Sequence, residues 1–216
     1  MSESSYLSSV RASYDAVAVD HARLLGTELF GEPADRAMLA AFAEHVRGHE
    51  GGGLAVADVG CGPGRVTAHL RDLGVRAFGT DLSPAMVAVA RRTYPGLRFE
   101  VGSMTSLDVA DGVLGGVVAW YSTVHTPPGE LPGVFAEFRR VLAPGGYALI
   151  AFRAGDRRLR LDHAYGHPVQ LDVYWTPPDR IVALLTEAGL TEVARLVREP
   201  RPPEKGPQGF VLARRA

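Results

Sequence analysis

Residues 58–65, DVGCGPGR, place a carboxylate just before a turn with three glycines in five positions. Glycine accepts a positive φ and leaves no Cβ between the backbone and a ligand. The helix expected to follow adds free N–H groups and a positive partial charge. A second carboxylate, Asp81, stands 21 positions after Gly60 at the end of the next expected strand, from which it reaches ribose hydroxyls. These residues predict a site for a ligand that contains a nucleoside.

The spacing of the glycines distinguishes between two kinds of nucleoside ligand. They run G-x-G-x-G rather than the G-x-G-x-x-G of a pyrophosphate clamp, and Asp58 stands two residues before the first. A carboxylate there repels a pyrophosphate and suits an ammonium group, bound directly or through water. The pattern therefore favours a nucleoside with an amino-acid tail, which is the chemistry of S-adenosylmethionine.

Short apolar strands and amphipathic helices alternate through most of the chain and position these residues. Strands are expected over 54–59, 75–81, 97–102, 112–121 and 147–153, and helices over 3–25, 32–48, 64–74, 83–96 and 129–146. Residues 153–167 read as polar and irregular, and they precede a strand over 168–175, a helix over 177–190 and strands over 191–199 and 208–215. This alternation predicts a parallel sheet with helices on both faces, closed by an antiparallel hairpin at one edge.

Five stretches of the sequence resemble, in order, the class I S-adenosylmethionine-dependent methyltransferases of the small-molecule type. They are DVGCGPGR (58–65), GTDLSPAMVAVAR (79–91), GSMTSLDV (102–109), AWYSTVHTPP (119–128) and FRRVLAPGGYALIAF (138–152). The resemblance runs from about Tyr14 to the C-terminus and implies a Rossmann-like, doubly wound α/β sheet of seven strands in the order 3-2-1-4-5-7-6. It also implies an antiparallel last strand pair and extra N-terminal helices. We expect one domain, with helices in residues 1–50 as a cap over the site and residues 51–216 as the core.

The resemblance also implies which residues bind the donor S-adenosylmethionine, whose product is S-adenosylhomocysteine. Those expected around its methionine end are Tyr14, Asp58, Gly60, Cys61, Gly62, Arg65, Trp120 and Tyr121, with Cys61 facing the amino-acid tail. Those expected around ribose and adenine are Asp81, Leu82, Met86, Gly102, Ser103 and Met104. Similar enzymes commonly have aspartate where this chain has Ser103, and a neutral hydroxyl accepts from the adenine amino group without charge assistance.

Two side chains are candidates for proton transfer at the methyl acceptor. His125 follows the fourth strand, where the methyl group should point, and a neutral imidazole is a suitable general base. Tyr14 matches the tyrosine that closes over the cofactor in similar enzymes. The alternatives are that His125 shapes the pocket and that Tyr14 is an ordinary residue of an amphipathic helix.

Residues near position 165 are expected to line or cover the acceptor site, namely His163, Tyr165, His167 and Tyr174. The neighbouring residues 156–162, DRRLRLD, either recognise an acidic group of the acceptor or form a solvated arginine-rich loop. His163 and His167 have helical spacing, but Gly166 and Pro168 argue against a helix there. Without a nearby cysteine or glutamate cluster, we expect no metal.

Composition narrows the class of partner. The formal net charge of −1 gives no basic surface for nucleic acid or acidic lipid, and a single cysteine, Cys61, excludes an internal disulfide. No apolar run approaches the ~20 residues that cross a bilayer, and residues 1–11 lack a signal-peptide pattern. We therefore expect a cytoplasmic monomer or homodimer that acts on a small molecule, without a nucleic-acid or membrane partner.

The expected function is transfer of a methyl group to an O, N or C atom of a small-molecule acceptor, of the secondary-metabolite kind, by in-line displacement. Alignment of the reactants supplies ~7–11 kcal/mol of such a barrier. The alternatives are a C-methyltransferase of quinone biosynthesis, a nucleotide-dependent oxidoreductase, and a protein that binds the nucleoside without turnover. Asp58 and the glycine spacing disfavour the oxidoreductase, whereas Ser103 is the feature that favours a binding protein.

Overall fold

The computed structural model describes residues 5–25, 32–48 and 53–216. Its helices are α1 (Ser5–Leu25), α2 (Pro33–Gly48), α3 (Arg65–Asp72), α4 (Pro84–Thr93), the 3-10 helix η2 (Thr123–His125), α5 (Leu131–Val141) and α6 (Pro178–Glu187). Its strands are β1 (Ala55–Val59), β2 (Ala77–Asp81), β3 (Phe99–Val101), β4 (Leu114–Trp120), β5 (Leu142–Arg153), β6 (Arg157–Ala164), β7 (His167–Trp175), β8 (Leu190–Arg198) and β9 (Gln208–Arg215). The predicted start of the first helix at residue 3 and the predicted boundary between residues 50 and 51 lie outside the described residues. None of the described helices is both long and apolar enough to span a membrane.

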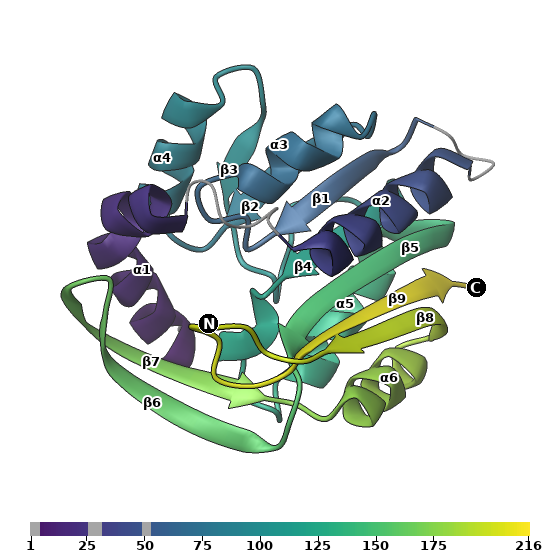
Figure 1. The fold of residues 1–216 in the computed structure, drawn as a ribbon. Helices are drawn as coiled ribbons and strands as arrows, with labels where there is room; N and C mark the ends of the chain where they lie inside the picture. Colours follow the sequence, from purple (N-terminus) through teal and green to yellow (C-terminus); the bar gives the residue numbers. More distant parts are fainter. Residues whose placement is uncertain (1–4, 26–31, 49–52) are drawn as a thin grey trace.

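Within the described part of the chain, seven strands form one sheet in the order β3-β2-β1-β4-β5-β9-β8 (Figure 1). β1 is parallel to β2 and β4, β2 is parallel to β3, and β4 is parallel to β5. β9 is antiparallel to both of its neighbours, β5 and β8. When only the seven strands of this sheet are numbered in chain order, β8 and β9 become the sixth and seventh, and the order is 3-2-1-4-5-7-6. This order confirms the predicted Rossmann-like α/β fold with its antiparallel last pair.

Helices cover both faces of the sheet because its central strands are apolar on both sides. Every residue of β4 is buried, and successive side chains enter different layers. Val117 packs in a cluster with residues of α5 and α6, whereas Val118 packs in a cluster with residues of α2 and α3. This arrangement directs the carboxyl ends of β1, β2 and β4 to one edge of the molecule, where the predicted binding residues lie.

Helix α2 belongs to one of these layers and not to a cap. Its Leu39 and Phe42 are completely buried in the cluster that contains Val118. Phe42 lies so close to β4 that a Cβ at Gly116 would approach its Cζ to 2.6 Å. The expectation that both N-terminal helices cap the site is therefore wrong for α2.

The segment 153–167, predicted to be irregular, contains strand β6, which pairs with β7 in a separate two-stranded antiparallel sheet. β7 alternates in burial, with Val169, Leu171, Val173 and Trp175 buried. β6 is mostly exposed and carries several arginines, so its composition looks like that of a loop. An antiparallel ribbon can have one face in water, so a polar sequence does not exclude a strand. The prediction of an irregular segment, which relied on polarity, was therefore wrong for β6.

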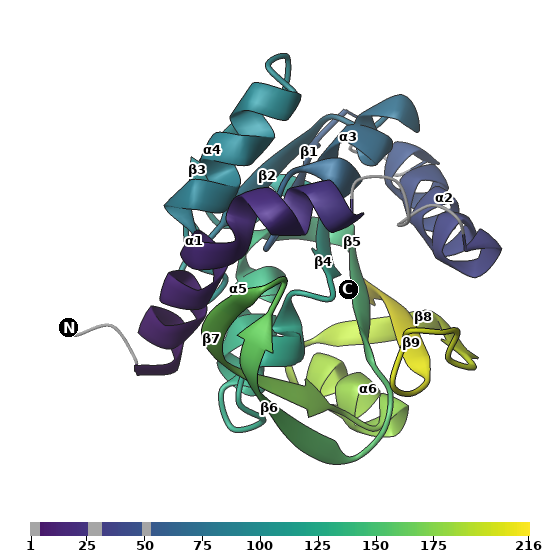
Figure 2. The ribbon, with the colours of Figure 1, turned by 60° about the vertical axis from the view of Figure 1, so that its left-hand side comes forward.

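Helix α1 lies beside this ribbon and is bonded to it (Figure 2). Ser9 Oγ donates to the carbonyl oxygen of Gln170 at 2.7 Å, and the Gln170 N–H donates to Ser13 Oγ at 3.0 Å. On its other side, α1 contacts α4, because Ser83 Oγ donates to Asp15 Oδ1 at 2.5 Å. The cover over the carboxyl edge therefore consists of α1 and the β6–β7 ribbon.

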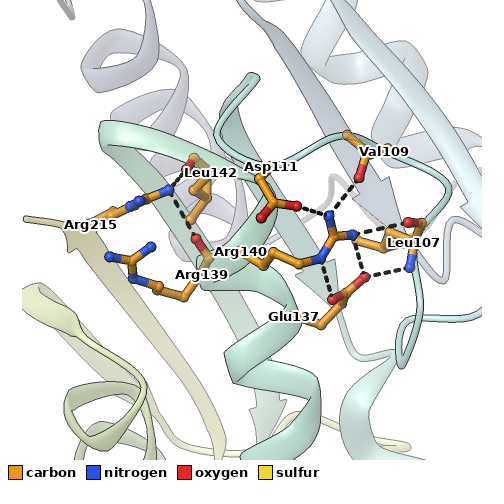
Figure 3. A network of polar contacts seen from close by, with 8 residues as sticks. All are labelled: Leu107, Val109, Asp111, Glu137, Arg139, Arg140, Leu142 and Arg215. Carbon is orange, nitrogen blue, oxygen red and sulfur yellow. Dashed lines mark hydrogen bonds and ion pairs between the residues drawn. The ribbon is translucent and has the colours of Figure 1, made fainter.

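A polar network at α5 fixes the segment that precedes β4 (Figure 3). The Arg140 guanidinium donates to both carboxylate oxygens of Glu137 at 2.7 Å and to the carbonyl oxygens of Val109 and Leu107 at 2.8 and 3.1 Å. Glu137 Oε1 also accepts from the Leu107 N–H at 2.6 Å. Arg140 and Glu137 thus replace backbone hydrogen bonds that an irregular segment cannot make for itself.

Replacing Arg140 with methionine is expected to lower the free energy of unfolding by about 1–3 kcal/mol, because it leaves Glu137 and two carbonyl oxygens without their donor. Urea denaturation measures this difference. Arg139→Met is the matched control, since Arg139 contributes only its carbonyl oxygen to the network. Equal loss in both variants would contradict the assigned role of Arg140.

Candidate active site

The glycine turn between β1 and α3 has the positive φ values that its sequence predicts. Gly60 has a φ of +73° and Gly62 a φ of +52°, and the Gly60 N–H donates to the carbonyl oxygen of Thr80 at 2.8 Å. A Cβ at Gly60 would lie 2.3 Å from Cβ of Ser122, which follows β4. The absence of a side chain at Gly60 therefore lets the turn lie directly against the end of β4.

Asp81, at the end of β2, binds this turn. Its Oδ2 accepts from the Gly62 N–H at 2.8 Å, and its Oδ1 accepts from the Ser83 N–H at 2.9 Å. Burial raises the pKa of Asp81 to about 6, against the opposing effect of the two backbone donors. A carboxylate has about four lone-pair positions, so Asp81 keeps acceptor capacity for two hydroxyl groups.

Asp58 lies beneath the same turn and is completely buried. Thr67 Oγ1 donates to its Oδ2 at 2.6 Å, whereas its Oδ1 has no hydrogen-bond partner among the described residues. Burial raises the pKa of Asp58 to about 7. A buried carboxylate oxygen without a donor is costly, and a ligand's ammonium group, reached directly or through water, would supply the missing donor.

Two predicted donor residues, Cys61 and Met86, differ from expectation in where their side chains lie. The Cys61 side chain packs with Val87 and Phe99 in the core, so the prediction that it faces the ligand's tail is wrong. Met86 is completely buried in a cluster with Val17 of α1, so its side chain has no exposed surface for contact with ribose or adenine. These positions contribute packing, with the Cys61 backbone still in the turn.

The other predicted donor residues lie around the same edge. Gly102 donates its N–H to the Asp81 carbonyl oxygen at 2.9 Å, and Ser103 Oγ is 2.8 Å from Thr105 Oγ1. Met104 is half-buried, and its Sδ accepts from Thr126 Oγ1 at 3.7 Å. Arg65 is the first residue of α3, and the Leu82 carbonyl oxygen accepts from Arg11 of α1.

The end of β4 carries several buried polar groups. Trp120 Nε1, the Tyr121 hydroxyl and Ser122 Oγ are buried without a hydrogen-bond partner among the described residues. Tyr121 has a φ of +54°, which is strained for a residue with a side chain, and its N–H donates to the Ala151 carbonyl oxygen at 2.9 Å. Strained residues and unsatisfied polar groups concentrate at functional sites, so these observations favour this edge as the reacting centre.

Tyr14 of α1 and His125 of η2, 111 residues apart, are joined by a hydrogen bond of 2.7 Å between the Tyr14 hydroxyl and His125 Nε2. His125 Nδ1 lies 2.8 Å from the carbonyl oxygen of Asp172, which can only accept. Nδ1 therefore carries the hydrogen, and Nε2 is the acceptor for the Tyr14 hydroxyl. Burial lowers the pKa of His125 to about 4, so the ring is neutral at neutral pH and Nε2 is its proton-accepting atom.

His21 completes an aromatic group above the glycine turn and was missed by the sequence reasoning. Its ring centroid lies 5.9 Å from that of Tyr14 and 4.8 Å from that of Tyr165. A Cβ at Gly62 would be 4.0 Å from its Cε1. Tyr14 and His21 are seven residues apart and share one helix face, which is the signal that could have indicated His21.

The four predicted acceptor residues separate into two groups. Tyr165 joins the aromatic group, with its pKa raised by burial. His163 is exposed, and His167 Nε2 lies 2.8 Å from Asp20 Oδ2, where it fastens the ribbon to α1. Tyr174 lies under Arg158, on the opposite face of β7 from the buried Val173 and Trp175. All three of these residues lie on the β6–β7 ribbon of the cover and outside the aromatic group, so the expectation that they line or cover the acceptor site stays a prediction.

Comparison with known proteins gives a consistent family. Residues 56–146 match the family model described as a methyltransferase domain. The chain is 35% identical over 96 residues to the demethylmenaquinone methyltransferase of Chlorobaculum parvum, covering 44% of this chain and 39% of that protein. It is 33% identical over 142 residues to the trans-aconitate 2-methyltransferase of Variovorax paradoxus, covering 62% and 52%. The chain thus spans about half or less of the length of these relatives.

Solved structures share the fold over nearly the whole chain. The magnesium protoporphyrin IX methyltransferase of Synechocystis PCC 6803, with bound S-adenosylmethionine, has a TM-score of 0.74 at 16% identity, and each chain is covered completely. The 1,6-didemethyltoxoflavin-N1-methyltransferase of Burkholderia thailandensis has a TM-score of 0.72 at 21% identity, with 98% of this chain and 89% of that chain covered. The glycine turn, Asp58 and Asp81 all fall within or beside the matched domain. Residues 56–146 therefore match a methyltransferase domain, and the chain has the fold of solved S-adenosylmethionine-dependent methyltransferases.

Proposed function

We propose that this protein transfers a methyl group from S-adenosylmethionine to an O, N or C atom of a small-molecule acceptor. The observation that carries the proposal is the juxtaposition, at one sheet edge, of the Asp81-bound glycine turn and the Tyr14–His125 pair. The orphaned Oδ1 of Asp58 supports a donor with an ammonium group, and Asp81 supports one with ribose hydroxyls. When bound, the donor supplies a methyl group on an already electrophilic sulfonium, so the protein needs no covalent intermediate.

The chain's own residues have two tasks in this reaction. Asp58, Gly60 and Gly62 bind and orient the donor, and the cover formed by α1 and the ribbon excludes water from the reacting centre. For an acceptor hydroxyl, the proton passes to Tyr14 Oη while the Tyr14 proton passes to His125 Nε2. The Asp172 carbonyl oxygen then stabilises the imidazolium through Nδ1–H.

Calorimetry with S-adenosylhomocysteine and with NADH tests the proposal. We expect binding of the first and none of the second, followed by release of S-adenosylhomocysteine when acceptors are supplied with the methyl donor. Binding of NADH alone would favour the oxidoreductase. Tight binding of the donor without turnover over a broad acceptor panel would favour a binding protein, and turnover restricted to quinones would favour the quinone C-methyltransferase.

A further inference from the structure

The arginines of the β6 segment are already paired, so they do not supply the acidic-group site that the sequence suggested as one alternative. The Arg158 guanidinium donates to both carboxylate oxygens of Asp172 at 2.9 and 2.7 Å. Arg160 Nε lies 3.5 Å from Asp162 Oδ1, and Arg157 donates to the carbonyl oxygen of Lys205. Of these side chains, Arg158 joins β6 to β7, and Arg157 joins β6 to the segment before β9.

Arg153, the last residue of β5, is different. Its guanidinium carbon lies 4.9 Å from the centroid of the Trp175 ring, and within the described residues it has no hydrogen bond or ion pair with a carboxylate. The positive charge of Arg153 acts on Glu204, but both carboxylate oxygens of Glu204 already accept from Arg198 at 2.7 Å. Arg153 is therefore a half-buried cation with an aromatic contact and no counterion in the described chain.

Arg153 faces the same edge as the proton-transfer pair. Trp175 packs in a cluster with Val124, which precedes His125, and with Tyr121 at the end of β4. Burial raises the pKa of Tyr14 and of Tyr121 and lowers that of His125, and the nearby positive charge of Arg153 favours the lower pKa at all three groups. A positive charge, aromatic rings and a proton acceptor therefore lie near one another at this edge of the sheet.

We propose that Arg153 binds a carboxylate of the methyl acceptor, so that the substrate is a small organic acid whose reacting atom lies at Tyr14 and His125. This inference rests on the proposed function. The planar guanidinium matches a carboxylate with two parallel hydrogen bonds, and Trp175 fixes its plane by cation–π contact. The anion would also neutralise a charge that burial makes costly.

The test measures binding of carboxylates and their matched carboxamides, benzoate with benzamide and succinate with succinamide, by calorimetry. Each is measured with and without S-adenosylhomocysteine. We expect a carboxylate of the panel to bind and its amide not to bind. Arg153→Gln should weaken carboxylate binding by about 10–100-fold, and Arg153→Lys by less, since lysine keeps the charge but not the planar pair of donors. Arg157→Gln is the matched control, because Arg157 stacks on the same Trp175 ring at 3.9 Å yet donates to a backbone carbonyl.

Three results would overturn the proposal. The first is that no carboxylate binds at millimolar concentration, and the second is that Arg153→Gln binds carboxylates as the wild type does. The third is that Arg153→Gln loses affinity for S-adenosylhomocysteine but not for 5′-methylthioadenosine, which would assign Arg153 to the donor's own carboxylate. Failure of the wild type to bind S-adenosylhomocysteine would contradict the proposed function instead, and the carboxylate measurements without it still decide the role of Arg153.

Discussion

His125→Ala is expected to lower kcat by about 10²–10⁴-fold with little change in donor affinity, because it removes the only proton acceptor bonded to Tyr14 among the described residues. The measurement is steady-state turnover of a hydroxyl acceptor together with calorimetry of S-adenosylhomocysteine. Equal loss of both properties would assign His125 to folding or donor binding. Unchanged turnover would show that the acceptor atom attacks the methyl group without a base to remove its proton.

Tyr14→Phe separates two routes for the proton. If the proton passes through Tyr14, phenylalanine should reduce kcat about as much as His125→Ala, since the relay is broken at its first member. If His125 acts directly, Tyr14→Phe frees Nε2 and turnover falls only slightly.

The acid limb of the wild-type pH profile, measured as kcat/KM for the acceptor at saturating donor, should lie near pH 4. Burial holds His125 neutral down to about that value, and activity is lost as the pH falls through it.

Asp81→Ala is expected to weaken binding of S-adenosylhomocysteine by about 10²–10³-fold. It removes the proposed acceptor for two ribose hydroxyls and releases the Gly62 N–H from the turn. Calorimetry measures the loss, and Asp108→Ala, which changes an exposed carboxylate of the segment after β3, is the control. Unchanged affinity in Asp81→Ala would remove Asp81 from the donor site.

The affinity for the donor product should also depend on pH. Burial raises the pKa of Asp58 to about 7 and that of Asp81 to about 6, so both carboxyls take up protons as the pH falls through this window. The neutral forms are weaker acceptors for an ammonium group and for hydroxyls, and binding should weaken on the acid side. In Asp81→Asn the part of this dependence near pH 6 should disappear.

Short-range sequence patterns were enough to predict most strands and helices of the sheet. The glycine turn, the proline and serine that begin α4, and the apolar runs of β1 and β4 are short-range signals, and each predicted element is present. The ribbon was only half predicted, because β7 alternates in burial whereas β6 is a polar outer strand. The assignment of α2 to a cap failed for a related reason, since an amphipathic helix does not specify which surface its apolar face covers.

The sequence by itself determined the glycine turn that approaches the ligand and the two carboxylates Asp58 and Asp81 in neighbouring strands, because residue types a few positions apart specify them. The strand order came from the resemblance of five motifs to a known family, and the connection rules of α/β folds agree with it. Only the tertiary structure decided the partners of the reacting groups. Tyr14 meets His125 across 111 residues, and Cys61 and Met86 turn into the core. Arg153 remains without a carboxylate partner in the described chain while its neighbours in sequence are paired, because contacts between distant segments depend on packing that no local pattern encodes.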